Sequence, residues 1–212
     1  MTTADAGSLF DDLAPGYDED RFHESVAEAL VQGLIPMTSP PVVLDIATGT
    51  GSAAFAALRL LDARGLVGVD ISPAMIERAR GRAVAEDKAG RIDWRIGEAV
   101  PAPVPDTSTD VVLCASALHF LGMAALRDWL RVLRPGGRVA FSLPPADTFR
   151  PSGAIAELVA TDLPLPQDAG QAAGVATAAG FEQATATRLD FAGGRPQAVF
   201  LVHASAPVDV RR

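Results

Sequence analysis

A short glycine-containing loop between two aspartates has the residue types and spacing to bind a nucleoside. The loop, Thr48-Gly49-Thr50-Gly51, lies between an apolar run at 42–44 and an alanine-rich helical stretch at 52–63. A strand, a glycine turn and a helix in this order form the first half of a nucleotide-binding βαβ unit. The glycines allow a tight turn and close approach of a ligand, and the free N–H groups of the helix start point into the crevice.

The two aspartates narrow the choice of ligand. The spacing Gly49-x-Gly51-x-x-Ala54 on its own also fits a dinucleotide fingerprint, which leaves a nicotinamide-dependent reductase as one alternative. Asp45, at the end of the first strand, would repel a pyrophosphate but suits a cationic ligand. Asp70 ends the next apolar strand, where an acid can accept hydrogen bonds from the ribose hydroxyls. A nucleoside with a positive centre and no phosphates is S-adenosylmethionine.

Further stretches follow in a fixed order along the chain and read LDIATGTG, VGVDISPAMIERAR, DVVLCASALHF and LRVLRPGGRVAFS. Together they resemble the motifs of class I S-adenosylmethionine-dependent methyltransferases, above all the ubiquinone/menaquinone-biosynthesis subgroup. The resemblance covers residues 10–143 and implies S-adenosyl-L-methionine as the cofactor. The cofactor-binding positions that it implies are Asp45, Ala47, Thr48, Gly49, Thr50, Gly51, Asp70, Ile71, Met75, Gly97, Glu98, Ala99, Cys114 and Ala115.

Some of these positions carry a specific role in the resembling family. Ile71 would stack on the adenine, and the Ala99 N–H would bond to an adenine ring nitrogen. Glu98 stands where the family usually has an aspartate beside the adenine amino group, and it reaches one methylene further. Ala115 would contact the methionine part through its backbone. Cys114 beside it is more typical of a small buried hydrophobe than of a nucleophile.

Tyr17 and His119 are the candidate catalytic residues. The segment 10–17, FDDLAPGY, reads as a turn, and in the resembling family a similar segment folds over the cofactor. Tyr17 would then cap the site near the methyl group; the alternative is a surface tyrosine. His119 follows the fourth strand, on the substrate side, and its near-neutral pKa suits a general base. The alternative is a packing residue at a helix start.

The pattern along the chain predicts an α/β fold of the Rossmann-like class I methyltransferase type. This is a three-layer sandwich with a mostly parallel seven-stranded sheet that ends in an antiparallel hairpin. We expect one domain over 1–212, with an N-terminal lid segment at 1–40, a cofactor-binding core at 41–143 and C-terminal helices and hairpin at 144–212. Later elements are expected as strands at 92–96, 110–115, 138–143, 182–191 and 198–204, and as helices from 22, from Ser72 to near 90, at 154–160 and at 169–179, with the hairpin turn across Gly193-Gly194.

Composition excludes several classes of protein. The net charge of −8 argues against a nucleic-acid partner, because phosphate binding needs a clustered basic face. Arg78, Arg80 and Arg82 do cluster, but they read as a solvated helix face. The single cysteine excludes an internal disulfide and fits a reducing cytosol. No signal peptide, membrane-spanning stretch or metal-ligand spacing is present, so a cytoplasmic protein without membrane or metal partners is expected.

The leading interpretation is a methyltransferase that acts on the oxygen, nitrogen or carbon of a small-molecule acceptor, in secondary or quinone metabolism. An alternative is a protein that binds the cofactor without transferring the methyl group, as a regulatory partner or a cyclase-like enzyme. The connection after the fifth strand is short and rich in Ala and Pro. It implies a pocket that is shallow or completed by a second subunit, as in a homodimer.

Overall fold

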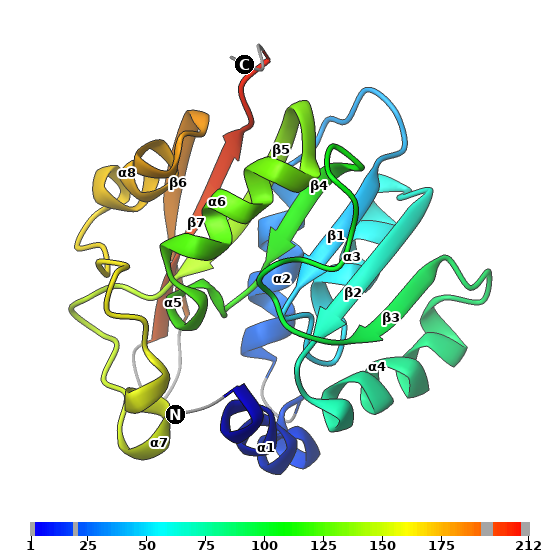
Figure 1. The fold of residues 1–212 in the computed structure, drawn as a ribbon, viewed down its shortest axis with the longest axis horizontal. Coiled ribbons are helices and arrows are strands. Elements are labelled where there is room, and N and C mark those ends of the chain that lie inside the picture. Colours follow the sequence, from blue (N-terminus) through cyan, green and yellow to red (C-terminus); the bar gives the residue numbers. More distant parts are fainter. Residues whose placement is uncertain (1–2, 19–20, 192–196, 209–212) are drawn as a thin grey trace.

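The described residues fold around one seven-stranded sheet with helices on both faces (Figure 1). The structure is a computed structural model and describes residues 3–18, 21–191 and 197–208. Its strands are β1 (Val42–Ile46), β2 (Gly65–Asp70), β3 (Ile92–Ile96), β4 (Thr109–Cys114), β5 (Leu133–Leu143), β6 (Glu182–Phe191) and β7 (Gln197–Ser205). The strand order is β3-β2-β1-β4-β5-β7-β6; β7 runs antiparallel to both its neighbours, and the other pairs are parallel. This topology confirms the predicted fold class.

The helices form the two outer layers of the sandwich. They are α1 (Thr3–Leu13), α2 (Phe22–Gln32), α3 (Ser52–Leu61), α4 (Pro73–Glu86), α5 (Leu118–Leu121), α6 (Met123–Val132), α7 (Gly153–Leu158) and α8 (Ala169–Ala179), with a short 3₁₀ turn, η1 (Ala14–Gly16), after the first. Helices α2, α3 and α4 share one core cluster with the sheet, and α5, α6 and α8 share the other. Figure 1 shows α6 and α8 in front of the sheet and α2 and α3 behind it.

The central strands are apolar on both sides, as a sheet between two helical layers requires. Successive side chains of β1 alternate between the two cores: Val43 joins the cluster of α2 and α3, and Leu44 joins that of α6 and α8. In β4, Val111 likewise joins the cluster of α2 and α3, and Val112 joins that of α6 and α8. These apolar runs therefore bring the ends of β1 and β4 side by side at one edge of the sheet.

Two helices begin at the caps that their sequences indicate. Ser72 accepts a hydrogen bond from the Met75 N–H (3.1 Å), and Pro73 follows at the first position of α4. Asp168 caps α8 by accepting from the Gln171 N–H (2.8 Å). Ser72, the residue that caps α4, lies two residues after Asp70 at the end of β2. The start of α4 therefore holds Asp70 in position at the edge of the sheet where a ligand would bind.

Two residues that are distant in sequence, on strands β5 and β7, hold the carboxyl end of α2 against the sheet. His203 on β7 lies 2.8 Å from the Leu30 carbonyl through its Nε2. Arg138 on β5 donates to the carbonyls of Gly33 (3.4 Å) and Leu34. Cationic and N–H donors at this position satisfy carbonyls that have no partner within the helix. The fit is tight, because a Cβ on Gly33 would lie 2.4 Å from the His203 ring.

The N-terminal segment differs from its prediction. Phe10 and the residues to Leu13 belong to α1, so the expected turn is limited to the short η1. The apolar residues Ala6, Phe10 and Leu13 recur at helical spacing and face a cavity, which explains why a helix forms there. The predicted hairpin turn across Gly193-Gly194 lies outside the described residues.

The arginine cluster on α4 is not the solvated face that its composition suggests. Arg78 donates to Asp18 (2.9 Å), and Arg82 donates to the carbonyl of Thr50 (3.2 Å). Arg80 donates to the carbonyl of Trp94 (2.9 Å). Because their partners come from other parts of the chain, periodicity along α4 could not reveal these contacts.

Candidate functional site

A cavity of about 710 Å³ opens at the carboxyl ends of the central strands. Its walls come from α1, from the loops after β1, β2, β3 and β4, from the segment after β5, and from the start of β7. The predicted site residues that line it are Tyr17, Ala47, Gly49, Asp70, Ile71, Met75, Gly97, Glu98, Ala99, Ala115 and His119. The volume is within the range of small-molecule sites, which argues against the shallow pocket that was one of the two expectations from the short connection.

Asp70 is held by the backbone of two loops. Its Oδ2 accepts a hydrogen bond from the Gly49 N–H (2.8 Å), and its Oδ1 accepts from the Ser72 N–H (2.9 Å). Burial raises the pKa of Asp70, although these backbone bonds oppose the shift. Each carboxylate oxygen keeps a further lone pair, so Asp70 can still accept from the hydroxyl groups of a ligand in the cavity. Ile71, Glu98 and Ala99 surround it on the same side.

Asp45 lies in a recess of about 20 Å³ beside the main cavity. Its Oδ2 accepts a hydrogen bond from the Thr48 hydroxyl (2.5 Å), but its Oδ1 has no hydrogen-bond partner of normal geometry. Thr50 also lines the recess, and Ala47 and Ala115 line both the recess and the cavity. A space of this size holds one water-sized group.

The environment of Asp45 favours a cationic guest. The residue is 1% exposed, and burial together with the charge of Asp70 raises its pKa to about 7, against the opposing bonds from the Thr48 hydroxyl and the Ala54 N–H. A buried carboxylate without a full set of partners is costly, and an ammonium group would remove that cost. The recess therefore fits the amino group of S-adenosyl-L-methionine, and the residues around Asp70 fit its nucleoside.

Aromatic rings make up the other half of the cavity. His119 packs against Phe120 (3.9 Å between ring centroids) and Phe149 (4.9 Å), and Phe10 on α1 meets Phe120 edge-on (5.9 Å). Tyr17 stacks on His23 at 4.6 Å. Planar rings on several sides favour an acceptor with a flat, apolar body.

His119 is a neutral histidine. Burial, together with the nearby His23, lowers its pKa to about 4. Its Nδ1 is buried and has no hydrogen-bond partner. The His119 ring lines the cavity, but a base of such low pKa has only a weak affinity for a proton. The prediction of a near-neutral pKa is thus corrected by the burial of the ring.

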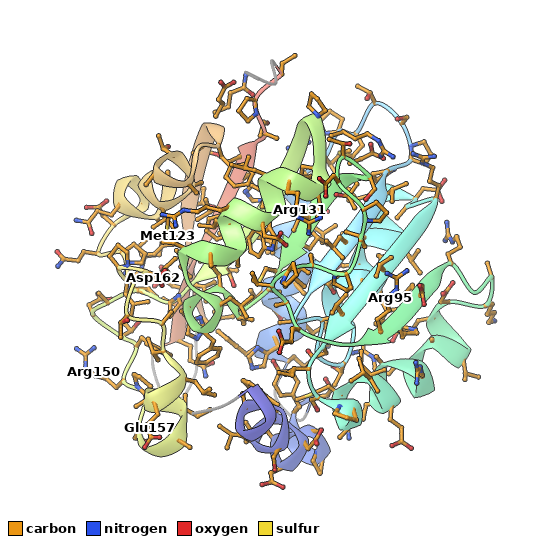
Figure 2. All side chains as sticks on the ribbon, in the orientation of Figure 1. Arg95, Met123, Arg131, Arg150, Glu157 and Asp162 are labelled. Carbon is orange, nitrogen blue, oxygen red and sulfur yellow. The ribbon has the colours of Figure 1, made fainter. Side chains whose placement is uncertain are left out.

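The segment after β5 closes the aromatic half. The Ala160 N–H donates to the His119 carbonyl (2.9 Å), and the Met123 N–H donates to Asp162 (3.3 Å). Figure 2 shows Asp162 beside Met123, and Glu157 on α7 below them. This short segment supplies a wall of the cavity from the same chain, including Phe149 and Glu157.

Two residues at the strand ends have a backbone conformation that side chains disfavour. Ala47 after β1 has φ 51°, and Ser116 after β4 has φ 62°. Both line the cavity, where strained backbone is often found. The Ser116 N–H donates to the hydroxyl of Ser142 (2.7 Å), while the Ser116 Oγ is buried without a partner.

Two predicted cofactor residues, Cys114 and Gly51, line neither the cavity nor the recess. Cys114 is fully buried in the core of α6 and α8, and burial raises its pKa, so it is an inert thiol. Gly51 lies against Trp94, and a Cβ at this position would come within 2.6 Å of the Trp94 ring. Gly51 therefore allows the loop to pack closely on Trp94, and Gly49 is the glycine that lines the cavity.

Several cavity residues escaped the sequence analysis. They come from segments far apart in the chain and are Phe10, His23, Ser116, Phe120, Ser142, Phe149 and Gln197. The helical spacing of Ala6 and Phe10 was a usable signal, and so was the position of Ser116 and Phe120 in the motif that contains His119. Phe149 and Gln197 carry no local signal.

Among the described residues, no histidine, cysteine, aspartate or glutamate side chains form a group of three or more that could hold a metal ion. Within the same residues, no helix has both the length and the apolar composition needed to cross a membrane.

Comparison with known proteins agrees with this geometry. Residues 43–137 match the family described as "Methyltransferase domain". The chain is 38% identical over 138 residues to an arsenite methyltransferase of Halobacterium salinarum, covering 60% of this chain and 35% of that protein. It is 31% identical over 158 residues to a ubiquinone/menaquinone biosynthesis C-methyltransferase of Geobacter sulfurreducens, covering 67% and 60%.

The fold has solved counterparts over its whole length. The cyclase SpnF superposes with a TM-score of 0.72 at 18% identity, covering 98% of this chain and 97% of that one. Such a likeness shows the fold alone. The chain spans about a third to three fifths of the length of the two curated relatives described above. These matches agree with the predicted resemblance: residues 43–137 match a methyltransferase domain, the curated relatives that match are methyltransferases, and the solved structure shares the predicted fold.

Proposed function

We propose that this protein transfers a methyl group from S-adenosyl-L-methionine to a small-molecule acceptor. The observation that carries the proposal is the buried Asp45 carboxyl, which lines an ammonium-sized recess beside the cavity and keeps one oxygen without a hydrogen-bond partner of normal geometry. A pyrophosphate has no favourable partner there, which argues against the nicotinamide-dependent alternative.

The residues divide into a binding half and an acceptor half. Asp45 binds the amino group, Asp70 accepts from the ribose hydroxyls, and Glu98 accepts from the adenine amine. Ile71 and Met75, which both line the cavity just after Asp70 in the chain, pack on the base. Gly49 brings the backbone close to the ligand, and its N–H keeps the Asp70 carboxylate in position.

The reaction needs little from the protein beyond alignment and the exclusion of water. S-adenosyl-L-methionine supplies a methyl group that is already activated on a sulfonium. The rings of Phe10, Phe120 and Phe149 hold the acceptor in place, and Tyr17 covers the boundary between the halves. His119 accepts the proton through Nδ1 where the acceptor atom still carries one.

The cavity lining favours a neutral or cationic acceptor. Asp70, Glu98 and Glu157 line it, and no lysine or arginine occurs among its described lining residues. An acceptor with a phosphate or carboxylate would therefore meet acidic groups without a compensating cation. We infer a flat, largely apolar molecule with a hydroxyl, amine or activated carbon to be methylated.

Calorimetry with S-adenosylhomocysteine, S-adenosyl-L-methionine and NADH tests the binding half of this proposal. Both sulfur nucleosides should bind and NADH should not. Tight NADH binding without a signal from S-adenosylhomocysteine would refute the proposal.

Incubation with methyl-labelled cofactor and fractionated metabolite extracts tests the transfer step. Label should enter a small, organic-extractable product. If the nucleosides bind but no fraction is labelled, the protein uses the cofactor without transfer, which is the alternative expected of a regulatory or cyclase-like protein.

A further inference from the structure

The N-terminal segment is fastened to the cofactor loops at two points, and the first point is Asp11 near the end of α1. Asp11 Oδ1 accepts hydrogen bonds from the hydroxyl of Ser72 and from the Ala74 N–H (3.0 Å). Ser72 is fully buried, and its own N–H donates to Asp70. A chain of contacts thus runs from α1 through Ser72 to the aspartate that binds the ribose.

The second point is Asp18, just after η1. Its Oδ1 accepts from the Thr50 hydroxyl (2.6 Å), and its Oδ2 accepts from Arg78 (2.9 Å). Arg78 also donates to the Pro15 carbonyl (3.2 Å), and Arg82 donates to the hydroxyl of Thr50 (3.3 Å). The two arginines therefore tie the glycine loop, α4 and the N-terminal segment together.

The stretch between these two points covers the cavity. Ala6, Phe10, Leu13 and Tyr17 all line it, so both halves of the site have a wall from this segment. Gly7 lies against the loop after β2, since a Cβ there would come 3.4 Å from the Ile71 carbonyl oxygen. Figure 1 shows α1 beside the start of α4, below the carboxyl ends of the strands.

We propose that Asp11 and Asp18 are positioning residues that latch residues 6–18 over the cavity, and that cofactor and product exchange through the release of these latches. The inference rests on the proposed function for the identity of the ligand. Both latches consist of protein groups alone, so they can close the segment before a ligand arrives. A ligand must then wait for the latches to open both when it enters and when it leaves.

This arrangement predicts a kinetic result that loss of ligand contacts would not give. Weakening a latch should raise the association and dissociation rate constants together, and the dissociation constant should change less than either. A residue that only supports the binding pocket would raise the dissociation rate without raising the association rate.

Surface plasmon resonance with S-adenosylhomocysteine on the full chain measures both rate constants. Asp11→Ala and Asp18→Ala should each raise both rate constants by about tenfold or more, because each variant loses two hydrogen bonds to a charged carboxylate. Asp11→Asn should stay near wild type, because a single oxygen of Asp11 accepts both bonds and the amide oxygen can replace it. Asp12→Ala is the matched control, an exposed aspartate on the same helix.

Faster dissociation with unchanged or slower association in both alanine variants would overturn the latch, and so would unchanged rates. Asp18 is a surface residue, so its variant keeps the test open if Asp11→Ala does not fold.

Amide hydrogen exchange without ligand separates this inference from the proposed function. Residues 6–18 should exchange faster in Asp11→Ala and Asp18→Ala than in Asp12→Ala. If the wild type binds no S-adenosylhomocysteine, the proposed function fails, and this comparison alone decides the latch: equal exchange in all three variants overturns it.

Discussion

Burial shifts the pKa values of three ionisable side chains in the site toward their uncharged forms. It raises the pKa of Asp45 to about 7, it also raises the pKa of Asp70, and it lowers the pKa of His119 to about 4. At neutral pH, the His119 imidazole is uncharged and Asp45 is near its midpoint. A ligand that carries its own charge therefore changes the protonation of the protein when it binds.

Cofactor binding should release a proton from Asp45. The carboxyl is half protonated near pH 7, whereas an ammonium group pairs with the ionised form. As the pH is raised toward 7, the affinity for S-adenosylhomocysteine should consequently increase by up to about tenfold per pH unit. Above pH 7 the affinity should level off. Calorimetry in buffers with different ionisation enthalpies measures both the slope and the proton count.

Asp45→Asn should bind more weakly and lose this pH dependence, while Asp93→Asn, an exposed change on β3, should keep it. A wild-type affinity that is flat between pH 5 and 7 would contradict the assigned role of Asp45.

His119 should contribute to turnover and not to cofactor binding. If it takes the acceptor proton, His119→Ala should lower turnover by roughly 10²–10⁴-fold with near wild-type affinity for S-adenosylhomocysteine. Because the folded pKa of His119 is about 4, the acid limb of the kcat/KM profile for the acceptor, measured at saturating cofactor, should lie near pH 4 and not near 6.5. Equal, modest losses of turnover and thermal stability would show instead that the ring only packs against Phe120 and Phe149.

The glycine loop between β1 and α3 packs tightly against Trp94 of the strand β3. Gly51 has φ 89°, and an added Cβ would meet Trp94 at 2.6 Å and Phe55 at 2.9 Å. The first turn of α3 and the strand β3 are therefore packed against each other through this loop, with no room for a side chain.

Gly51→Ala should destabilise the protein by about 1–3 kcal/mol and weaken S-adenosylhomocysteine binding, because strain and overpacking add at this position. Gly81→Ala is the matched control: Gly81 lies within α4 with open space around it, and the change should stabilise by about 0.5–1 kcal/mol. Denaturant unfolding measures both. Similar stabilities for the two variants would contradict the packing argument.

Elements with clear local signals were predictable to the residue. The strands at 92–96 and 182–191 and the helix at 169–179 have the predicted bounds; Gly97 follows the first strand, and Asp168 and Gly180 flank the helix. Helix α1 was not predicted because its apolar residues face a cavity that forms only in the folded protein. In the site, Asp70 and His119 could be placed from motifs, whereas Phe149 and Gln197 reach the cavity through tertiary packing.

Across the whole molecule, the cavity draws its walls from both ends of the described chain. Ala6 and Phe10 come from α1, and Gln197, Ala198 and Val199 come from the first residues of β7. A ligand that bridges these walls binds the folded state and not the unfolded chain, so binding should add directly to global stability.

S-adenosylhomocysteine at a concentration 100 times its dissociation constant should stabilise the protein by about 2.7 kcal/mol. For a chain of this size, that corresponds to a rise in Tm of about 5–10 °C, whereas NADH at the same concentration should give none. Differential scanning fluorimetry measures the shift. A saturating nucleoside that leaves Tm unchanged would mean that it does not bridge the walls of the cavity.

The contacts that His203 and Arg138 make with the end of α2 have a consequence for biosynthesis. Helix α2 leaves the ribosome early, but its carboxyl end gains its partners from β5 and β7, and the His203 contact spans 173 residues of sequence. β7 also inserts between β5 and β6, so the sheet is complete only after it has emerged. The carboxyl end of α2 therefore gains these contacts only after β5 and β7 have been synthesised, so folding of this layer cannot be completed locally.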